Sequence, residues 1–262
     1  MVLPLRDDNP TKRLAVVTLV LIAINIGVYA FVQPHGSDQH ETEWQVQHAA
    51  IPCEVREQRP ITFGEYNTET CGRAAAIEAG APPASAQVAP FPHKNVDLAV
   101  FVSMFLHASW FHVLGNMLFL WVFGNNVEDR FGPLGFVLFY VLCGLIAFGA
   151  FYLSEPGSTA PLVGASGAIA GVMGAYLVFW PRARVLTLIG IIVLPVPASV
   201  VLLLWFVLQF ATDATSGVAW VAHVGGFLAG AAIALLVRTL RPTTPPAPPP
   251  PPLPPPVMPW EA

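Results

Sequence analysis

The chain has 262 residues, of which 55% are hydrophobic and 11% are charged, and its formal net charge is −4. A soluble domain carries about 25% charged residues, so this composition favours a membrane protein. The weak acidic balance, without a basic stripe, excludes nucleic acid as a partner.

Apolar segments recur along the chain, and each approaches the ~20 residues that a helix needs to cross the hydrocarbon core. They are 14–33, 109–127, 133–154, 162–180, 197–213 and 218–238. The expected fold is therefore all-α, a polytopic membrane bundle of six transmembrane helices. Pro195 and Pro197 interrupt the fifth apolar run, because proline ends or kinks a helix. We expect an interfacial piece over 185–194 and the span over 197–213.

The basic residues predict that both termini are cytoplasmic. Eight of the 12 Lys and Arg residues fall on one side of the expected bundle: Arg6, Lys12, Arg13, Arg130, Arg182, Arg184, Arg238 and Arg241. The other four lie in a long loop, which is translocated regardless of its charge. The expected order is a cytoplasmic N-terminus (1–13), a first span (14–33), an extracytoplasmic loop (34–108), a core of five spans (109–238) and a cytoplasmic tail (239–262).

The expected loop 34–108 is rich in Ala, Pro, Glu and Gln and shows no convincing periodicity. Cys53 and Cys71 form a disulfide if the loop faces an oxidising compartment, or remain free thiols otherwise; we favour the disulfide. The loop also contains four histidines, His35, His40, His48 and His93. Their spacing matches no zinc pattern, so we expect no metal and no cofactor.

The tail has 12 prolines between Pro242 and Pro259. Such a composition predicts polyproline II or disorder rather than a packed element. We interpret the tail as a cytoplasmic spacer, and a partner that binds it is the alternative.

Ser166 lies in the Gly-Ala-Ser-Gly run 164–167, at the start of an apolar segment. A serine in a membrane helix most often bonds back to a carbonyl one turn earlier or packs against a neighbour. Here the flanking glycines permit an irregular turn, and Pro161 indicates that a helix begins nearby. Free backbone N–H groups at a helix start can stabilise an oxyanion, so Ser166 is a candidate nucleophile. Because position 168 is Ala, the run is not an α/β-hydrolase elbow.

His223 lies in another apolar segment, 57 positions after Ser166. A buried imidazole without a partner is costly, and Ser166 is the best partner that the chain offers. Glycines four residues apart occur in both segments and permit close helix packing: Gly167 with Gly171, and Gly226 with Gly230. Either these glycines serve packing alone, or they also bring the imidazole to the serine.

Acidic residues do not complete a triad, because the nearest ones fall at span ends or in loops: Glu128, Asp129 and Asp213. The expected chemistry is a Ser–His dyad in which His223 is the general base. His112 and Asn116 are four residues apart and share one helical face, and His107 precedes them. His112 and Asn116 either form hydrogen bonds between helices or, with the backbone N–H of Ser166, stabilise an oxyanion.

Three separated motifs agree with one known family. They are His107-Ala-Ser-Trp-Phe-His112-Val-Leu-Gly-Asn116, Gly164-Ala-Ser166-Gly167 and Ala222-His223-Val-Gly-Gly226. The chain resembles the rhomboid family of intramembrane serine proteases over about residues 100–238 and the first span. The resemblance implies that Ser166 is the nucleophile, that His223 is its base, and that His112 and Asn116 stabilise the oxyanion. It also implies a six-helix core whose fifth span, around Trp205 and Phe206, gates substrate entry.

The chain departs from the family pattern at two places. A Trp-Arg pair is missing from the first loop, and Ala170 replaces an aromatic residue that in some members stacks on the catalytic histidine. The second departure puts the support of the histidine in question. Residues 124–132, with Glu128 and Arg130, resemble the family's second-loop motif, which we interpret as structural.

The expected function is an intramembrane endopeptidase that cleaves single-span membrane proteins near the extracytoplasmic face of the lipid bilayer. The chain has no His-Glu-x-x-His motif and no pair of mid-span aspartates, which disfavours metal and aspartyl chemistry. The alternative is a catalytically silent rhomboid-like protein that binds transmembrane helices. Because both Ser166 and His223 are present, we favour the enzyme. The compact form of the chain suggests the plasma membrane of a bacterium.

Overall fold

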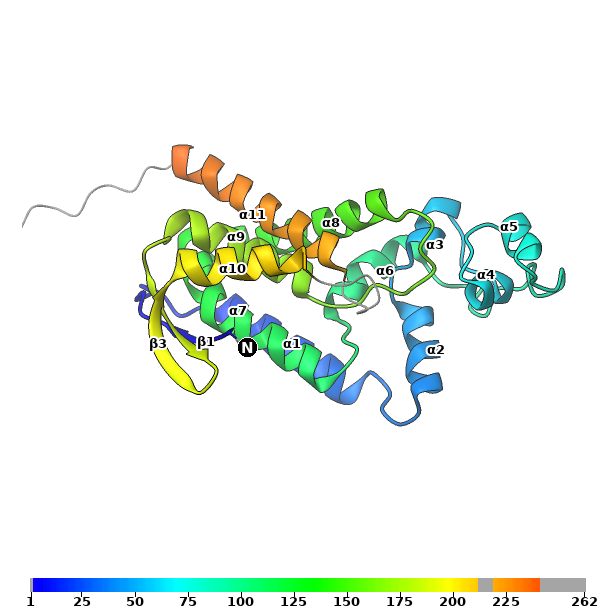
Figure 1. The fold of residues 1–262 in the computed structure, drawn as a ribbon, viewed down its shortest axis with the longest axis horizontal. Coiled ribbons are helices and arrows are strands. Elements are labelled where there is room, and N and C mark those ends of the chain that lie inside the picture. Colours follow the sequence, from blue (N-terminus) through cyan, green and yellow to red (C-terminus); the bar gives the residue numbers. More distant parts are fainter. Residues whose placement is uncertain (1, 212–218, 241–262) are drawn as a thin grey trace, which may run out of the picture.

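The structure is a computed structural model that describes residues 2–211 and 219–240. The end of the fifth expected span, Asp213 and the proline-rich tail lie outside the described residues. Figure 1 shows a long bundle of helices with a small sheet at one end and a group of short helices at the other.

Helices overlap every one of the expected apolar segments. They are α1 (Val16–Phe31), α7 (Trp110–Phe131), α8 (Pro133–Ser154), α9 (Ser166–Phe179), α10 (Ala198–Gln209) and α11 (Trp220–Leu240). In the described part of the chain, α8 and α11 are long and apolar enough to cross a membrane by themselves. Helix α7 meets the same criterion only together with Val96–Phe105, from which it is bent by 75°. The protein is therefore a largely helical membrane protein, and the count of six spans stays a prediction.

Helix α9 lies at the centre of the bundle, and every residue from Gly167 to Tyr176 is buried. It packs against α11 through glycines that belong to both helices. A Cβ atom at Gly226 would collide with the carbonyl oxygen of Gly167, and one at Gly230 with that of Gly171. Only glycine allows the two backbones to come so close. Since His223 lies one turn before Gly226, this contact carries its side chain toward the start of α9.

The N-terminus of α1 is capped by a carboxylate from another helix. The side chain of Glu128, in α7, accepts the N–H groups of Val17 (2.9 Å) and Thr18 (2.7 Å) and the hydroxyl of Thr18 (2.8 Å). These bonds satisfy donors that a helix start leaves free, and the helix dipole favours a negative charge there. The stretch 124–132, expected from the resemblance to be a loop motif, is helical to Phe131.

The all-α expectation is wrong at one end of the molecule, where three antiparallel strands form a sheet of order β1-β2-β3. The strands are β1 (Val2–Asp7), β2 (Arg184–Ile189) and β3 (Ile192–Pro197). The piece expected to lie at the interface, 185–194, is thus most of a hairpin that turns at Gly190 (φ +64°). Its Val and Ile residues favour a strand, and Pro195 is tolerated because β3 is an edge strand.

The loop 34–108 is also more ordered than its composition predicts. It contains α2 (Asp38–His48), α3 (Pro52–Glu57), α4 (Phe63–Thr68), α5 (Arg73–Glu78), α6 (Val96–Val102) and a 3₁₀ turn, η1 (Ser103–Phe105). These helices are too short to show a clear period. A small apolar core holds Val46, Ile51, Cys53 and Ile61 together. We call residues 38–95 the loop module.

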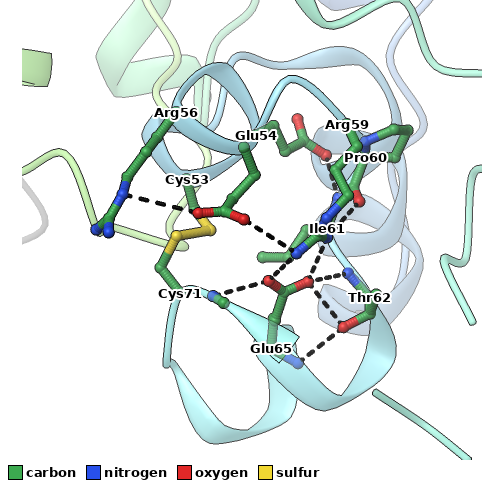
Figure 2. The surroundings of a disulfide bond; sticks show 11 residues. Cys53, Glu54, Arg56, Arg59, Pro60, Ile61, Thr62, Glu65 and Cys71 are labelled. Atoms are coloured by element: carbon green, nitrogen blue, oxygen red, sulfur yellow. Dashed lines mark hydrogen bonds and ion pairs between the residues drawn. A yellow bond between two sulfur atoms is a disulfide. The ribbon is translucent and has the colours of Figure 1, made fainter. Parts of the chain in front are cut away.

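The disulfide between Cys53 and Cys71 is formed (Figure 2). Beside it, the fully buried carboxylate of Glu65 accepts a bidentate pair of hydrogen bonds from Arg59, at 2.8 and 2.7 Å. The same carboxylate also accepts bonds from Thr62 and from the N–H of Gly72. Burial by itself would raise the pKa of Glu65, but these hydrogen bonds lower the pKa to about 2.

Candidate active site

The motif residues converge on one cavity of about 510 Å³, enclosed by the bundle helices and the segment before α9. Its lining includes Ser166, His223, His112 and Asn116, although these residues come from three different helices. Figure 1 shows these helices, α7, α9 and α11, running together through the bundle. The structure therefore brings together all four residues that the sequence singled out.

Ser166 and His223 are in direct contact. Ser166 is the first residue of α9, and His223 lies in the first turn of α11. The serine Oγ and the imidazole Nε2 are 2.8 Å apart. Because both side chains are partly exposed to the cavity, a reacting group could reach the hydroxyl while it remains bonded to the imidazole.

The second nitrogen of the imidazole meets a residue that the sequence analysis overlooked. Nδ1 of His223 lies 2.8 Å from Oε1 of Gln209, the last residue of α10. The Gln209 side chain is buried. Polar residues within a membrane helix often mark function, so the position of Gln209 in the apolar run 198–210 is a signal by which the sequence could have indicated this residue.

Helix α10 also supplies an aromatic neighbour. The ring of Trp205 lies 5.8 Å from the imidazole of His223, with an interplanar angle of 40°. Ala170 has no ring to offer at the position where some rhomboid proteins place one. The aromatic neighbour of His223 therefore comes from α10 and not from position 170 of α9.

His112 faces the serine from α7. Its Nδ1 accepts the N–H of Ala108 at 3.4 Å, so the ring proton is on Nε2. A Cβ atom built on Gly164 would lie 2.9 Å from this Nε2 and 3.5 Å from the Ser166 hydroxyl. The N–H donor of His112 and the serine oxygen are thus neighbours across Gly164, whose φ of +128° favours glycine.

Asn116 lies one turn further along α7 and also lines the cavity. Its amide Nδ2 is buried, and it has no hydrogen-bond partner within residues 2–211 and 219–240. A buried donor without an acceptor is costly in a folded protein. The amide is therefore available to an acceptor that enters the cavity.

His107 has a different position from that of His112. Its side chain is fully buried, and its ring packs edge-on against that of His112 at 5.1 Å. The backbone of His107 exchanges two hydrogen bonds of 2.8 Å with the side chain of Gln33. His107 thus supports His112 from behind and links the end of α1 to the start of α7.

The loop histidines do not gather around a metal site. His35 and His48 each bond a backbone carbonyl, of Tyr29 and Trp44 respectively. The described ranges contain no group of three or more His, Cys, Asp or Glu side chains that could hold a metal ion.

This geometry defines a class of protein: a helical membrane protein that encloses a serine–histidine pair beside further hydrogen-bond donors. The model of the Rhomboid domain matches residues 97–240, more than half of the chain. The chain belongs to the rhomboid family.

Three relatives illustrate the similarity. RHOMBOID-like protein 1 of Arabidopsis thaliana is 35% identical over 139 residues, which are 53% of this chain and 34% of the relative. Rhomboid protein 1, mitochondrial, of Saccharomyces cerevisiae is 30% identical over 145 residues, 51% of this chain and 40% of the relative. Presenilin-associated rhomboid-like protein, mitochondrial, of Mus musculus is 36% identical over 97 residues, 36% of this chain and 25% of the relative. The chain thus spans less than half the length of each of these proteins.

Proposed function

We propose that the chain is an intramembrane serine endopeptidase that cleaves single-span membrane proteins. The observation that carries the proposal is the 2.8 Å contact between Ser166 Oγ and His223 Nε2 in a cavity within an apolar bundle. A serine hydroxyl becomes a nucleophile when an adjacent base accepts its proton. The membrane character of the surrounding helices selects substrates that are themselves in the bilayer.

In this mechanism, Oγ of Ser166 attacks the scissile carbonyl carbon while Nε2 of His223 takes the hydroxyl proton. The imidazolium then gives the proton to the leaving amine, and the peptide bond breaks. Water subsequently attacks the acyl-enzyme, again with His223 as base, and releases the second product. The cavity has to admit this water from outside the bilayer.

The oxyanion that forms on the scissile carbonyl faces three kinds of donor. Nε2–H of His112 and Nδ2 of Asn116 come from α7, and the N–H of Ser166 comes from the start of α9, where backbone donors are free. Donors that are already in place need no reorganisation when charge develops, so they stabilise the transition state selectively.

The substrate helix has to unwind at the cut site, because helical hydrogen bonds shield the scissile carbonyl. We therefore expect small or helix-breaking residues there. Helix α10 serves as the gate between the bilayer and the cavity: Trp205 contacts Phe119 of α7 at a ring distance of 6.5 Å. Separation of these two rings would open a lateral path to Ser166.

The site opens on the extracytoplasmic side in this proposal, and both termini are cytoplasmic. The pairing of β1 with β2 supports this orientation, since it places the N-terminal strand beside residues 184–189 at one end of the bundle. The loop module lies at the opposite end (Figure 1). Two of the relatives are mitochondrial by name, so the bacterial plasma membrane stays a prediction.

The experiment is cleavage of a fluorogenic single-span substrate in liposomes by the wild type, Ser166→Ala and His223→Ala. We expect turnover by the wild type alone. Replacement of the small residues at the cut site by leucine should slow cleavage and leave substrate insertion unchanged. Equal turnover by Ser166→Ala would refute the mechanism. If the wild type and both variants bind the substrate and none of them cleaves it, the catalytically silent rhomboid-like alternative is supported.

A further inference from the structure

The amide of Gln209 is oriented by its own helix. Its Nε2 donates a hydrogen bond of 3.1 Å to the carbonyl oxygen of Trp205, one turn earlier in α10. If the amide were reversed, its oxygen would face that carbonyl, and two acceptors would be in contact. The oxygen Oε1 therefore faces His223, where it lies 2.8 Å from Nδ1.

This orientation determines the tautomer of the imidazole. An amide oxygen only accepts hydrogen bonds, so Nδ1 of His223 has to carry the ring proton. A neutral imidazole has one N–H, which leaves Nε2 with a free lone pair. Nε2 can then accept the proton of the Ser166 hydroxyl at 2.8 Å. A general base requires this tautomer.

We propose that Gln209 is a positioning residue that holds His223 in its reactive tautomer and orientation, and that α10 thereby completes a Ser166–His223–Gln209 relay. The proposal rests on the proposed function, because a relay has this meaning only in an enzyme. Gln209 performs the orienting role of a triad acid without a negative charge. This role suits a buried site in an apolar bundle, where an unpaired carboxylate would be costly.

Both groups that hold the imidazole lie on one face of α10. Trp205 and Gln209 are four residues apart, so they share a helical face. The opposite face is apolar and exposed, as Val200 and Val207 are 53% and 61% exposed. Helix α10 therefore orients the base on one side and presents an apolar surface on the other.

The test compares three variants in the full chain in liposomes or micelles. Gln209→Met removes the acceptor but keeps the length and volume of the side chain. Gln209→Glu keeps an acceptor oxygen for Nδ1 of His223 but loses the N–H that Gln209 donates to the carbonyl of Trp205. Val207→Met introduces the same new residue on the open face of the helix and is the matched control. Thermal unfolding of each variant checks that the fold is retained.

The first measurement reads the tautomer without any reference to activity. The ¹⁵N shifts of histidine-labelled protein distinguish the two neutral tautomers, and the His223→Gln variant assigns the signal. We expect Nδ1 to be protonated in the wild type, in Gln209→Glu and in Val207→Met. In Gln209→Met we expect a mixture of the two tautomers.

The second measurement is the rate of labelling of Ser166 by a fluorophosphonate, with kcat and KM on a single-span substrate. Gln209→Met should lower the labelling rate and kcat by roughly 10- to 100-fold, the range for one lost hydrogen bond to a group that becomes charged, with KM unchanged. Gln209→Glu should stay within tenfold of the wild type. If Gln209→Met keeps both the wild-type tautomer and the wild-type rate, the proposal is overturned. If the wild type does not react at all, the proposed function fails, and the ¹⁵N shifts still decide whether Gln209 sets the tautomer.

Discussion

Ala50 and Leu162 form an antiparallel bridge in which the N–H of Leu162 donates to the carbonyl of Ala50 at 2.8 Å. A second link joins the N–H of Cys53 to the carbonyl of Ser158 at 3.0 Å. The loop module is therefore attached to the segment that leads directly into Ser166. A change in the loop module should therefore alter the reactivity of Ser166.

The disulfide provides the first test of this connection. Replacing Cys53 and Cys71 together by serine removes a covalent loop with a sequence separation of 18 residues. We expect a loss of about 3 kcal/mol in the free energy of unfolding and slower fluorophosphonate labelling of Ser166. Thermal unfolding and labelling rates measure the two effects. Reductant should reproduce both in the wild type and change nothing in the double variant; a reductant-insensitive wild type would contradict the account.

The carboxylate of Glu65 should make the loop module sensitive to acid. The pKa of Glu65 is about 2 in the folded chain, against an ordinary value of 4.5. The pKa of Glu65 is lower in the folded chain than in the unfolded chain. The ionised carboxylate therefore stabilises the fold fully above pH 4.5, and this stabilisation is lost as the pH falls toward 2. At neutral pH the contribution is roughly 3 kcal/mol.

Glu65→Gln should therefore reduce the hydrogen-exchange protection of peptides from residues 52–79 at neutral pH. Comparison of variant and wild type at equal pH removes the intrinsic pH dependence of exchange. The difference between them should shrink as the pH falls toward 2. Glu78→Gln, at an exposed position of the same module, is the control. A difference that does not depend on pH would show that the carboxylate charge is not responsible.

Gly164→Ala should inactivate the site while the bundle remains folded. The new Cβ would lie 2.9 Å from the ring of His112, and a φ of +128° strains any residue other than glycine. Because a displacement of about 1 Å at a reacting group can cost 10²-fold in rate, we expect labelling to fall by roughly 100-fold. Gly157→Ala is the matched control, since a Cβ there meets nothing closer than 3.8 Å. Equal rates for both variants would argue against the close approach of His112.

Asn116→Ala should lower kcat by roughly 10²- to 10³-fold with little change in KM, because an oxyanion donor acts mainly in the transition state. His112→Ala should behave similarly, although it also removes a ring that packs on His107. Steady-state cleavage of a single-span substrate measures both. Asn125→Ala changes another asparagine of α7 that does not line the cavity, and it should keep near wild-type kcat. A rise in KM alone for Asn116→Ala would assign the amide to substrate binding.

The sequence predicted the largely helical fold and singled out four residues that line one cavity, because both depend on strong local signals. Ser166 and His223 are isolated polar groups in apolar runs, and glycines four residues apart predicted the close contact of α9 with α11. The sheet was missed because β2 pairs with a strand from the far N-terminus, and no local pattern reveals that partner. The loop module was missed because its helices are short, although Thr62 and Glu65 form a capping box that the sequence displays. Gln209 was not predicted, because the usual partner of a catalytic histidine is a carboxylate and not an amide.

The most direct measurement is fluorophosphonate labelling of the full chain in liposomes, with the modified residue located by mass spectrometry. We expect modification at Ser166 in the wild type, none in Ser166→Ala, and labelling slowed by at least about 10³-fold in His223→Ala. Modification of another residue, or a His223→Ala variant that labels as fast as the wild type, would contradict the central claim that Ser166 and His223 act together as nucleophile and base.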